Sequence, residues 1–211
     1  MSFQEEVLSS LQKRVLRQLG TALRPWHFYL GGGTAVALHL GHRHSLDLDW
    51  FTAERIADPM RLAQDLREEG IPFQTGQIER GTLHGTVSGV RVSFLEYRYP
   101  LLEPLHLWEE YGCFVASLDD LACMKLVAVT QRGSKKDFVD VYALALEHKP
   151  LAELLRLYQR KYSIDDTAHV LYGLAYFDEA DQERLPKMRW NVDWRRIKKT
   201  LQGWLKEMIN G

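Results

Sequence analysis

The stretch YLGGGTAVALHLGHRHSLDLDWF, residues 29–51, combines three consecutive glycines with two aspartates that are separated by a single residue. WHFYL, residues 26–30, is aromatic and apolar and runs into the glycines, as a short buried strand before a tight turn does. TAVALHLG, residues 34–41, is typical of a short helix, and LDLDWF, residues 46–51, alternates with the period of a strand. The stretch therefore predicts a strand, a glycine turn, a helix and a second strand.

The glycine turn is the first candidate binding element. Glycines between a strand and a helix let the backbone approach a ligand and leave the first amide N–H groups of the helix facing it, which attracts phosphate. We therefore expect the glycine turn at Gly32 and Gly33 to face a phosphate group. A tight turn that requires positive φ is the alternative. The Rossmann and Walker patterns are absent, since there is no G-x-G-x-x-G and no Lys-Ser or Lys-Thr closes the glycine run.

The paired acids are the second candidate element. On a strand, Asp47 and Asp49 project from the same face, with Leu46, Leu48 and Trp50 on the other. Two carboxylates this close repel each other unless a cation or a basic side chain lies between them. Carboxylate oxygens suit Mg²⁺, and nucleotide phosphates commonly complete its coordination shell. The pattern predicts that Asp47 and Asp49 bind Mg²⁺, with a solvated strand face as the alternative.

Composition limits the class of protein. The chain has 211 residues, 45% hydrophobic and 26% charged, which is ordinary for a globular protein. It has no apolar run near the roughly 20 residues that span a bilayer and no secretory signal pattern, so we expect no membrane association. Two cysteines, Cys113 and Cys123, fit a reducing compartment and predict a cytoplasmic protein. The net charge of −1 means that phosphate binding must depend on local basic clusters.

The rest of the chain changes character near its middle. Apolar spacing predicts helices at 4–19 and 58–69, ended by Gly20 and Gly70. Short β-leaning segments then predict an antiparallel meander and one further strand, at 72–79, 81–88, 90–97 and 113–117. After Leu118 only helices are expected, at 118–131, 135–147, 150–162, 165–176 and 193–208. The fold class is therefore α+β followed by an all-α C-terminal bundle, with domains at 1–115 and 116–211.

The first C-terminal helix places a lysine among apolar residues. Lys125 shares a stripe with Leu118, Ala122 and Val129, and Arg132 lies on roughly the same face. Burying an ammonium group is costly unless it is paired. An inward lysine and arginine suit a triphosphate, as a point charge and a planar fork respectively. The alternative is that Lys125 reaches solvent along its own stem.

Two acids on the next helix are also expected to point inward. Asp137 and Asp140 share a face with Val141 and Leu144. Ser134 and Asp137 also fit the S-x-x-D capping pattern, as do Ser117 and Asp120, and we assign Asp120 that role alone. A structural ion pair between Asp140 and Lys125 or Arg132 is the main alternative to a role in the active centre.

Together these motifs resemble a known family. The glycine turn, a helix and Asp-x-Asp, with thirteen residues between Gly33 and Asp47, resemble the nucleotidyltransferase signature of the DNA polymerase β superfamily. With DDLACMKLVAVTQRGSKKDFVDVYAL, residues 119–144, the chain is similar to the AbiEii/AbiGii-type nucleotidyltransferase toxins. The resemblance covers about residues 27–147. It implies a polymerase-β-like domain whose small mixed sheet is flanked by helices.

The resemblance also implies a third carboxylate, on a neighbouring strand, that helps to activate the attacking hydroxyl. In VRVSFLEY, residues 90–97, the expected position is Ser93, and Glu96 falls on the opposite face of a regular strand. Three explanations stay open. Glu96 enters through a bulge, the third acid comes from elsewhere, or catalysis is weak or lost.

The resemblance implies a Mg²⁺-dependent nucleotidyltransferase that moves a nucleoside monophosphate from a nucleoside triphosphate to a hydroxyl. The implied acceptor is tRNA or another RNA, and the implied partner is the antitoxin of a toxin–antitoxin pair. The expected catalytic residues are Asp47, Asp49, Lys125 and Asp137, and Gly32, Gly33, Thr34 and Arg132 are expected to bind the nucleotide. The alternative is a catalytically weakened nucleotide- or RNA-binding module with the same fold.

Two further patterns receive a structural interpretation. His39, His42 and His44 lack other ligands at zinc spacing, so no zinc site is expected, and Arg43 and His44 are placed beside the acids or at the helix end. The last predicted helix has a basic face formed by Arg195, Arg196, Lys198 and Lys199. We interpret it as a solvated face, and an RNA-binding role would require it to border the cleft.

Overall fold

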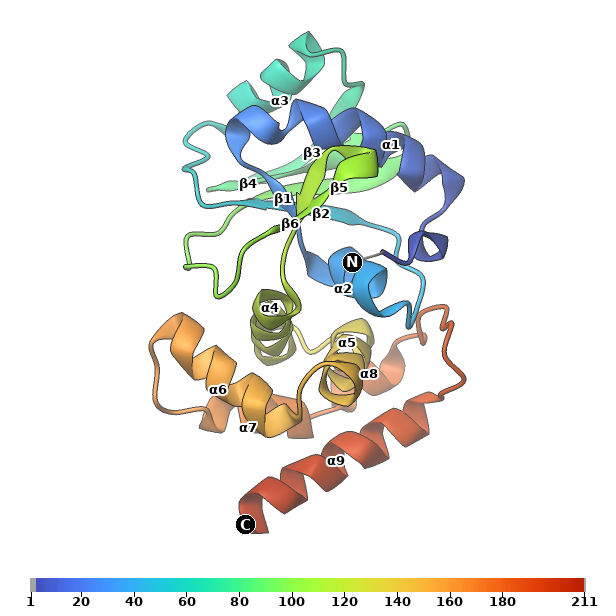
Figure 1. The fold of residues 1–211 in the computed structure, drawn as a ribbon, viewed down its shortest axis with the longest axis vertical. Helices are drawn as coiled ribbons and strands as arrows, with labels where there is room; N and C mark the ends of the chain where they lie inside the picture. Colours follow the sequence, from blue (N-terminus) through green and yellow to red (C-terminus); the bar gives the residue numbers. More distant parts are fainter. Residues whose placement is uncertain (1–2, 211) are drawn as a thin grey trace.

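A computed structural model describes residues 3–210 and shows a sheet at one end of the molecule and a group of helices at the other (Figure 1). Helices α1 (Ser10–Ala22) and α3 (Pro59–Glu68) lie above the sheet in this view. Helix α2 (Gly32–Leu40) lies below it, between the sheet and the helical half. The glycine turn at the start of α2 is therefore placed where the two halves meet.

The sheet has seven strands in the order β3-β4-β5-β2-β1-β7-β6. Their bounds are Tyr29–Leu30, Leu48–Thr52, Phe73–Glu79, Thr82–Val87, Val90–Glu96, His106–Trp108 and Cys113–Val115 for β1 to β7. The pairs β1–β7 and β2–β5 are parallel and the others antiparallel, so the sheet is mixed. The predicted meander is confirmed as β3, β4 and β5. Strand β6 was missed because it lies in a proline-containing connector without a strand pattern.

After β7 the chain is helical, as predicted. The helices are α4 (Leu118–Gln131), α5 (Lys135–Glu147), α6 (Leu151–Tyr162), α7 (Ala168–Ala175), α8 (Asp178–Gln182) and α9 (Trp194–Asn210). In α5 every residue from Asp137 to Ala145 is buried, which makes α5 the centre of this half. The α+β fold class is thereby confirmed, while the division into two domains at residue 115 stays a prediction.

The first helix differs from its prediction. It begins at Ser10 because Ser9 and Gln12 form a capping box, and residues 5–7 form a separate 3₁₀ turn. It also continues through Gly20 to Ala22. A Cβ atom on Gly20 would lie 2.0 Å from the carbonyl oxygen of Tyr111, so this glycine serves close packing and does not end the helix.

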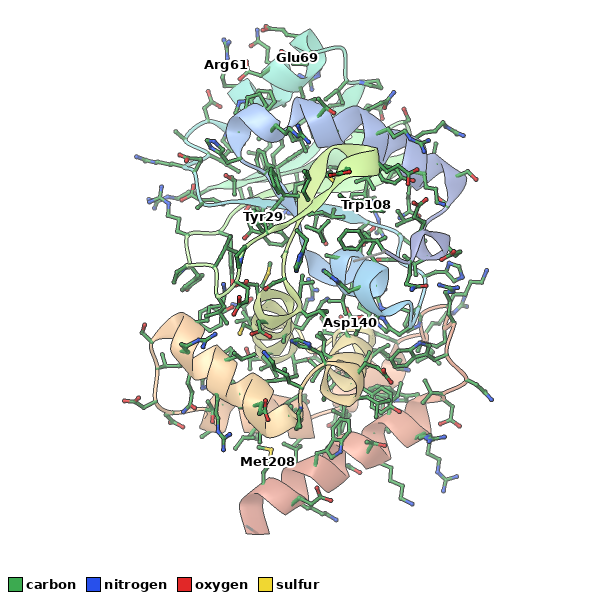
Figure 2. All side chains as sticks on the ribbon, in the orientation of Figure 1. Tyr29, Arg61, Glu69, Trp108, Asp140 and Met208 are labelled. Carbon is green, nitrogen blue, oxygen red and sulfur yellow. The ribbon has the colours of Figure 1, made fainter. Side chains whose placement is uncertain are left out.

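Buried and exposed side chains separate clearly (Figure 2). Tyr29 and Trp108 lie within the sheet half, and Asp140 lies on α5, at the side of the helical half that faces α2, with no exposed surface. Arg61 and Glu69 project outward at the far end. Within residues 3–210, no helix is long and apolar enough to cross a membrane.

Candidate active site

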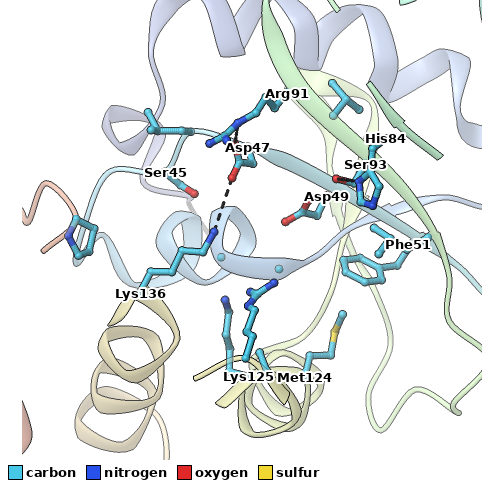
Figure 3. Close-up of a pocket in the computed structure, with 18 of the residues that line it drawn as sticks. Ser45, Asp47, Asp49, Phe51, His84, Arg91, Ser93, Met124, Lys125 and Lys136 are labelled. Atoms are coloured by element: carbon cyan, nitrogen blue, oxygen red, sulfur yellow. Dashed lines mark hydrogen bonds and ion pairs between the residues drawn. The ribbon is translucent and has the colours of Figure 1, made fainter. Parts of the chain in front are cut away.

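A cavity of about 740 Å³ lies between the sheet and the helical half (Figure 3). Strands β2, β4 and β5 form one wall, helix α4 forms the facing wall, and the first turn of α2 contributes Gly32 and Gly33. The cavity therefore brings together sequence motifs that are about a hundred residues apart. Seven of the predicted site residues can be located in its walls or directly behind them, and Thr34 is an exception.

The glycine turn brings backbone against charged side chains. Gly32 has φ of 62°, the left-handed region, so the positive-φ explanation holds at this position. A Cβ atom on Gly32 would lie 2.6 Å from Oδ2 of Asp49, and one on Gly33 would lie 2.4 Å from Nη2 of Arg43. Both glycines line the cavity. The two explanations of the glycines thus coexist, because the turn that needs positive φ is also the point of closest approach.

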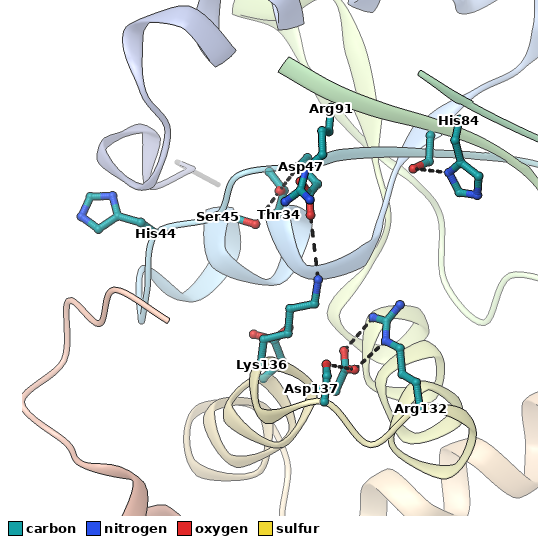
Figure 4. Close-up of polar contacts among 12 residues, drawn as sticks. Thr34, His44, Ser45, Asp47, His84, Arg91, Arg132, Lys136 and Asp137 are labelled. Carbon is teal, nitrogen blue, oxygen red and sulfur yellow. Dashed lines mark hydrogen bonds and ion pairs between the residues drawn. The ribbon is translucent and has the colours of Figure 1, made fainter. Parts of the chain in front are cut away.

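Thr34 has a different position from the one expected. Its buried hydroxyl donates to the carbonyl oxygen of Asp47 and shares a 2.7 Å hydrogen bond with the Ser45 hydroxyl (Figure 4). It does not line the cavity. Thr34 therefore fixes the segment that leads into β2, and the prediction that it cradles phosphate finds no support in this geometry.

The paired acids lie on the cavity wall, although the strand is shorter than predicted. Strand β2 begins at Leu48, because the carbonyl group of Asp47 bonds to Thr34 and pairing with β5 starts at Leu48 opposite Val92. Leu46 is 70% exposed and is not part of an apolar strand face. Asp47 and Asp49 nevertheless both line the cavity (Figure 3).

The two acids differ in their surroundings. Asp47 forms an ion pair of 2.7 Å with Arg91 and a longer one of 3.8 Å with Lys136. Burial raises the pKa of Asp49, and the nearby charge of Asp47 raises it further, against the opposing effects of Ser93 and Lys125. The surrounding protein therefore compensates the negative charge of Asp49 only in part.

The chemistry of these two carboxylates fits a Mg²⁺ ion. They offer hard oxygen ligands on one wall, and the raised pKa of Asp49 shows that a further cation would stabilise its charged form. Within the described chain, no group of three or more His, Cys, Asp or Glu side chains is arranged to hold a metal ion. Such an ion would therefore take the remaining ligands from water and substrate phosphates.

Lys125 reaches the cavity from within the apolar face of α4, as predicted. Its side chain is 3% exposed, and Nζ lies 3.0 Å from Oδ1 of Asp137 and 2.7 Å from Oδ2 of Asp140. Burial would lower the pKa of Lys125, but Asp140 and Asp137 outweigh it and raise the pKa. Lys125 is therefore charged, does not extend into solvent, and presents a positive charge to the cavity.

Asp137 lies behind the cavity wall. Arg132 donates to it from Nε at 2.7 Å and Nη2 at 2.9 Å, and the Ser134 hydroxyl donates at 2.6 Å (Figure 4). Ser134 thus bonds to the carboxylate, and no backbone N–H caps onto its side chain as the S-x-x-D pattern predicted. Burial would raise the pKa of Asp137, but Lys125 and Arg132 hold it well below its ordinary value. This carboxylate orients Lys125 and Arg132 and is a poor proton acceptor.

Asp140 is the centre of a buried ion network. It accepts from Arg43 Nε at 2.6 Å and Nη2 at 2.8 Å, lies 2.8 Å from Nε2 of His42, and also pairs with Lys125. Burial would raise the pKa of Asp140, but Arg43 and Lys125 hold it well below its ordinary value. The structural ion pair to Lys125, an alternative in the sequence analysis, is present, whereas Arg132 pairs with Asp137 instead.

Strand register tests whether Glu96 supplies the third carboxylate. In the parallel pair β2–β5, Asp49 lies opposite Ser93 without a bulge, and Glu96 lies opposite Thr52. The Glu96 carboxylate accepts from the backbone N–H of Ile56 at 3.0 Å and pairs with Arg98 at 2.7 Å. Glu96 does not line the cavity, so the proposal that it enters through a bulge is wrong.

Sequence reasoning missed several residues that line the cavity. Arg91 and Lys187 add positive charge, and His84 faces the cavity from β4. Lys136, which the family resemblance implies to lie near the active centre, also lines the cavity. His84 lies opposite Ser93 in the antiparallel pair β4–β5. The alternation in β4 and β5 was a signal that could have found His84 and Arg91, once the register with β2 was known.

Of the remaining basic and histidine motifs, only Arg43 and His44 line the cavity, as expected from their place beside the acids. Helix α9 is at the end of the molecule farthest from the sheet, and no residue of it lines the cavity (Figure 1). Its Lys198 pairs with Asp181 at 2.7 Å. The condition set for an RNA-binding role of this basic face is therefore not met. His42 bonds to Asp140 and His39 to the carbonyl oxygen of Ala116, so these histidines serve packing contacts.

Comparison with known proteins gives a consistent result. The sequence model of the family described as nucleotidyl transferase AbiEii toxin, Type IV TA system, matches residues 14–205. The chain is 40% identical over 158 residues to the uncharacterized protein aq_aa25 of Aquifex aeolicus, covering 74% of this chain and 76% of that protein.

Solved structures show the same fold at low sequence identity. The nucleotidyltransferase toxin MenT4 of Mycobacterium tuberculosis has a TM-score of 0.61 at 14% identity, over 93% of this chain and 83% of its own. JHP933 of Helicobacter pylori has a TM-score of 0.59 at 16% identity, over 98% and 93% respectively. With its cavity, its paired acids and a family match over most of its length, the chain belongs to the AbiEii nucleotidyltransferase toxin family.

Proposed function

We propose that this nucleotidyltransferase uses Mg²⁺ to transfer a nucleoside monophosphate from a nucleoside triphosphate to a hydroxyl of an RNA. One observation carries the proposal: Asp47 and Asp49 share a cavity wall with the Gly32–Gly33 backbone, opposite Lys125. This arrangement combines carboxylates for a cation with backbone and lysine contacts for phosphates. A nucleoside triphosphate carries both the phosphates and the need for a cation.

The charge of the cavity favours a polyanion. Six of the side chains that line it are Lys or Arg, namely Arg43, Arg91, Lys125, Arg132, Lys136 and Lys187, against two acids, Asp47 and Asp49. Lys136 is 45% exposed and its contact with Asp47 is 3.8 Å long, so it can move toward a ligand, whereas Lys125 and Arg132 are held by aspartates. The positive surplus supports binding of a triphosphate and stabilisation of charge that develops on it.

The other part of the cavity is apolar. Phe51 and Tyr97 have ring centroids 5.8 Å apart and line the cavity together with Leu95 and Met124. An aromatic and thioether surface beside a phosphate-binding region suits the flat face of a nucleobase. The cavity therefore has complementary regions for both ends of a nucleotide.

In the proposed reaction each group has a distinct task. Asp47 and Asp49 would hold the Mg²⁺ ion, which would supply charge neutralisation at the phosphates. The Gly32–Gly33 backbone lets the phosphates approach, Lys125 and Arg132 bind their oxygens, and Asp137 holds these two cations in place. A hydroxyl oxygen then bonds to the α-phosphorus while the bond to the leaving pyrophosphate breaks.

The acceptor and the partner rest on the family. Exposed cationic side chains at the cavity, such as Arg91 at 68% and Arg132 at 57%, provide contacts for the phosphates of an RNA, and tRNA is the first acceptor to test. Membership of a family described as a toxin of a Type IV TA system supports a cognate antitoxin, which would neutralise the toxin in the cytoplasm.

The experiment incubates the purified protein with each α-labelled nucleoside triphosphate, Mg²⁺ and total RNA. Asp49→Ala and a reaction with EDTA serve as controls. We expect label to enter an RNA species with the wild type only, and only with Mg²⁺. If the wild type labels neither RNA nor protein with any of the four triphosphates, the proposed activity is refuted.

Ser93 favours a second candidate function. Because Ser93 occupies the position opposite Asp49, the site lacks a carboxylate there, and a nucleotide- or RNA-binding module with weak catalysis would have this feature. Triphosphate binding, measured by calorimetry on the same preparation, separates the two functions. Binding without any transfer supports the module, and binding with transfer supports the enzyme.

A further inference from the structure

His84, Ser93 and Asp49 form a row across three neighbouring strands. Asp49 on β2 lies opposite Ser93 on β5, and Ser93 lies opposite His84 on β4. Paired residues on adjacent strands project to the same face of a sheet. All three line the cavity, and His84 hangs from the wall beside Ser93 (Figure 3).

The hydrogen bond between His84 and Ser93 fixes how the imidazole can act. Nδ1 of His84 lies 3.0 Å from the Ser93 hydroxyl. Nδ1 is thereby occupied by Ser93, so Nε2 is the ring nitrogen left for a substrate. In the tautomer that carries its proton on Nδ1, the serine oxygen accepts from Nδ1–H, and Nε2 of His84 has a free lone pair.

We infer that His84 is the general base of the transfer and takes the role that a third carboxylate would have at Ser93. This inference rests on the proposed function. Strands of a sheet lie about 4.8 Å apart, so β4 is one strand farther from Asp49 than β5 is. The imidazole is longer than an aspartate side chain, and its Nδ1 comes within 3.0 Å of the Ser93 hydroxyl, which offsets part of that distance.

The step balances without any further reactant. The acceptor O–H bond breaks and its proton goes to Nε2 of His84, while the oxygen bonds to the α-phosphorus. The bond from the α-phosphorus to the bridging oxygen breaks, and pyrophosphate leaves with that electron pair. His84 then returns its proton to solvent.

The other groups that face the cavity do not compete for this task. Asp137 and Asp140 are held ionised by cations and do not line the cavity. The acids that line the cavity with His84 are Asp47 and Asp49, which are assigned to the cation. The other charged side chains of the lining are cationic, namely Arg43, Arg91, Lys125, Arg132, Lys136 and Lys187. The second histidine of the lining, His44, lies on the far side of Asp47 from His84 (Figure 4).

The test compares wild type, His84→Gln and a matched control, His169→Gln, whose side chain is on α7 and outside the cavity. We measure kcat and KM for the labelled triphosphate across pH 5–9 with the RNA acceptor found above. A general base typically contributes about 10²- to 10⁴-fold. We expect His84→Gln to lower kcat at least about 100-fold, to keep the triphosphate KM, and to lose the acid limb of the pH profile, while His169→Gln behaves as wild type.

A role in sheet stability alone would give different results. If the kcat of His84→Gln is within threefold of the wild-type kcat, the role of His84 is overturned. A lowered kcat with an unchanged acid limb of the pH profile also overturns it. Either result leaves the proposed function intact. No transfer by the wild type overturns both. If His84→Gln fails to bind triphosphate, the Ser93→Ala variant is measured instead. The kcat of Ser93→Ala should fall about tenfold, with the acid limb of its pH profile retained, if Ser93 orients His84. An unchanged kcat of Ser93→Ala refutes the inference.

Discussion

Two pairs of aspartates lie at the same cavity, and the protein treats them in opposite ways. Asp137 and Asp140 are fully buried, and each is held by two cationic side chains, which lower the pKa of both carboxyl groups. Asp49 is only partly buried at the cavity wall, and there desolvation and the adjacent Asp47 raise its pKa. Residue type therefore does not distinguish a scaffold acid from a functional one, whereas charge compensation and exposure to the cavity do.

Lys125 connects the two pairs. Its Nζ is held by Asp137 and Asp140 on one side, and its side chain lines the cavity that Asp47 and Asp49 face. The inner pair thereby keeps a cation in a place where burial alone would remove its charge. The inner acids therefore build the positive wall, and in the proposed function the outer acids would complete the site with a cation from solution.

The largest expected effect is on activity, from Asp49→Asn. Transfer should fall by about 10³-fold or more, because an essential charge at the phosphates is lost. The free energy of unfolding of the metal-free protein should stay the same or rise, since the removed charge was disfavoured by burial. Initial rates of transfer check the effect on activity, and urea unfolding at pH 7 checks the effect on stability. A clear loss of stability would show that Asp49 belongs to the scaffold.

Asp140→Asn should have the largest effect on stability. Removing one partner of a buried ion network leaves Arg43 and Lys125 uncompensated, and such changes cost about 3–5 kcal/mol. The matched control is Asp181→Asn, which breaks an ion pair with Lys198 near the surface and should cost less than about 1 kcal/mol. Equal losses of unfolding free energy in the two variants would contradict the scaffold role.

The glycine turn gives a smaller expected effect. In Gly33→Ala the new Cβ would lie 2.4 Å from Nη2 of Arg43, which cannot retreat without weakening its contacts to Asp140, so we expect a loss of about 1–3 kcal/mol. Gly203→Ala in α9 is the control, because nothing lies within 4 Å of its Cβ position, and it should gain about 0.5–1 kcal/mol. Thermal unfolding of both variants measures the contrast, and a stable Gly33→Ala would refute the close packing.

The smallest expected effect concerns pH. Asp137 and Asp140 have lowered pKa values, so their contribution to stability is complete above about pH 5 and is lost as the pH falls below about 4 toward the folded-state values. The contribution of Asp49 to stability changes with pH in the opposite direction, because its raised pKa means that ionisation at rising pH disfavours the folded state. Urea unfolding from pH 3 to 7 should show a flatter acid limb for Asp140→Asn than for wild type. If the stability of the wild type and of Asp140→Asn falls equally steeply with decreasing pH, the lowered pKa of Asp140 is contradicted.

Much of the site could be predicted because its signals are local. The alternation around Asp49, the glycine run and the position of Lys125 in an apolar helical face each depend on a few neighbouring residues. Periodicity fixes which way such side chains point before any tertiary contact forms. The paired acids and Lys125 were therefore placed in one site from sequence.

The remaining features depend on contacts between distant segments. Arg43 meets Asp140 across 97 positions, and no local pattern marks either as the partner of the other. The row from Asp49 to His84 exists only once the register of β2, β5 and β4 is known. Thr34 was misplaced for the same reason, since its hydroxyl is taken by the carbonyl group of Asp47.

The central claim is that Asp47 and Asp49 take up a cation with the triphosphate, while Asp137 and Asp140 are complete without one. Calorimetric titration of Mg²⁺ in the presence of a non-hydrolysable triphosphate analogue tests it directly. We predict saturable Mg²⁺ binding by the wild type that is abolished in Asp49→Asn while the protein stays folded. Undiminished Mg²⁺ binding by Asp49→Asn would contradict the claim.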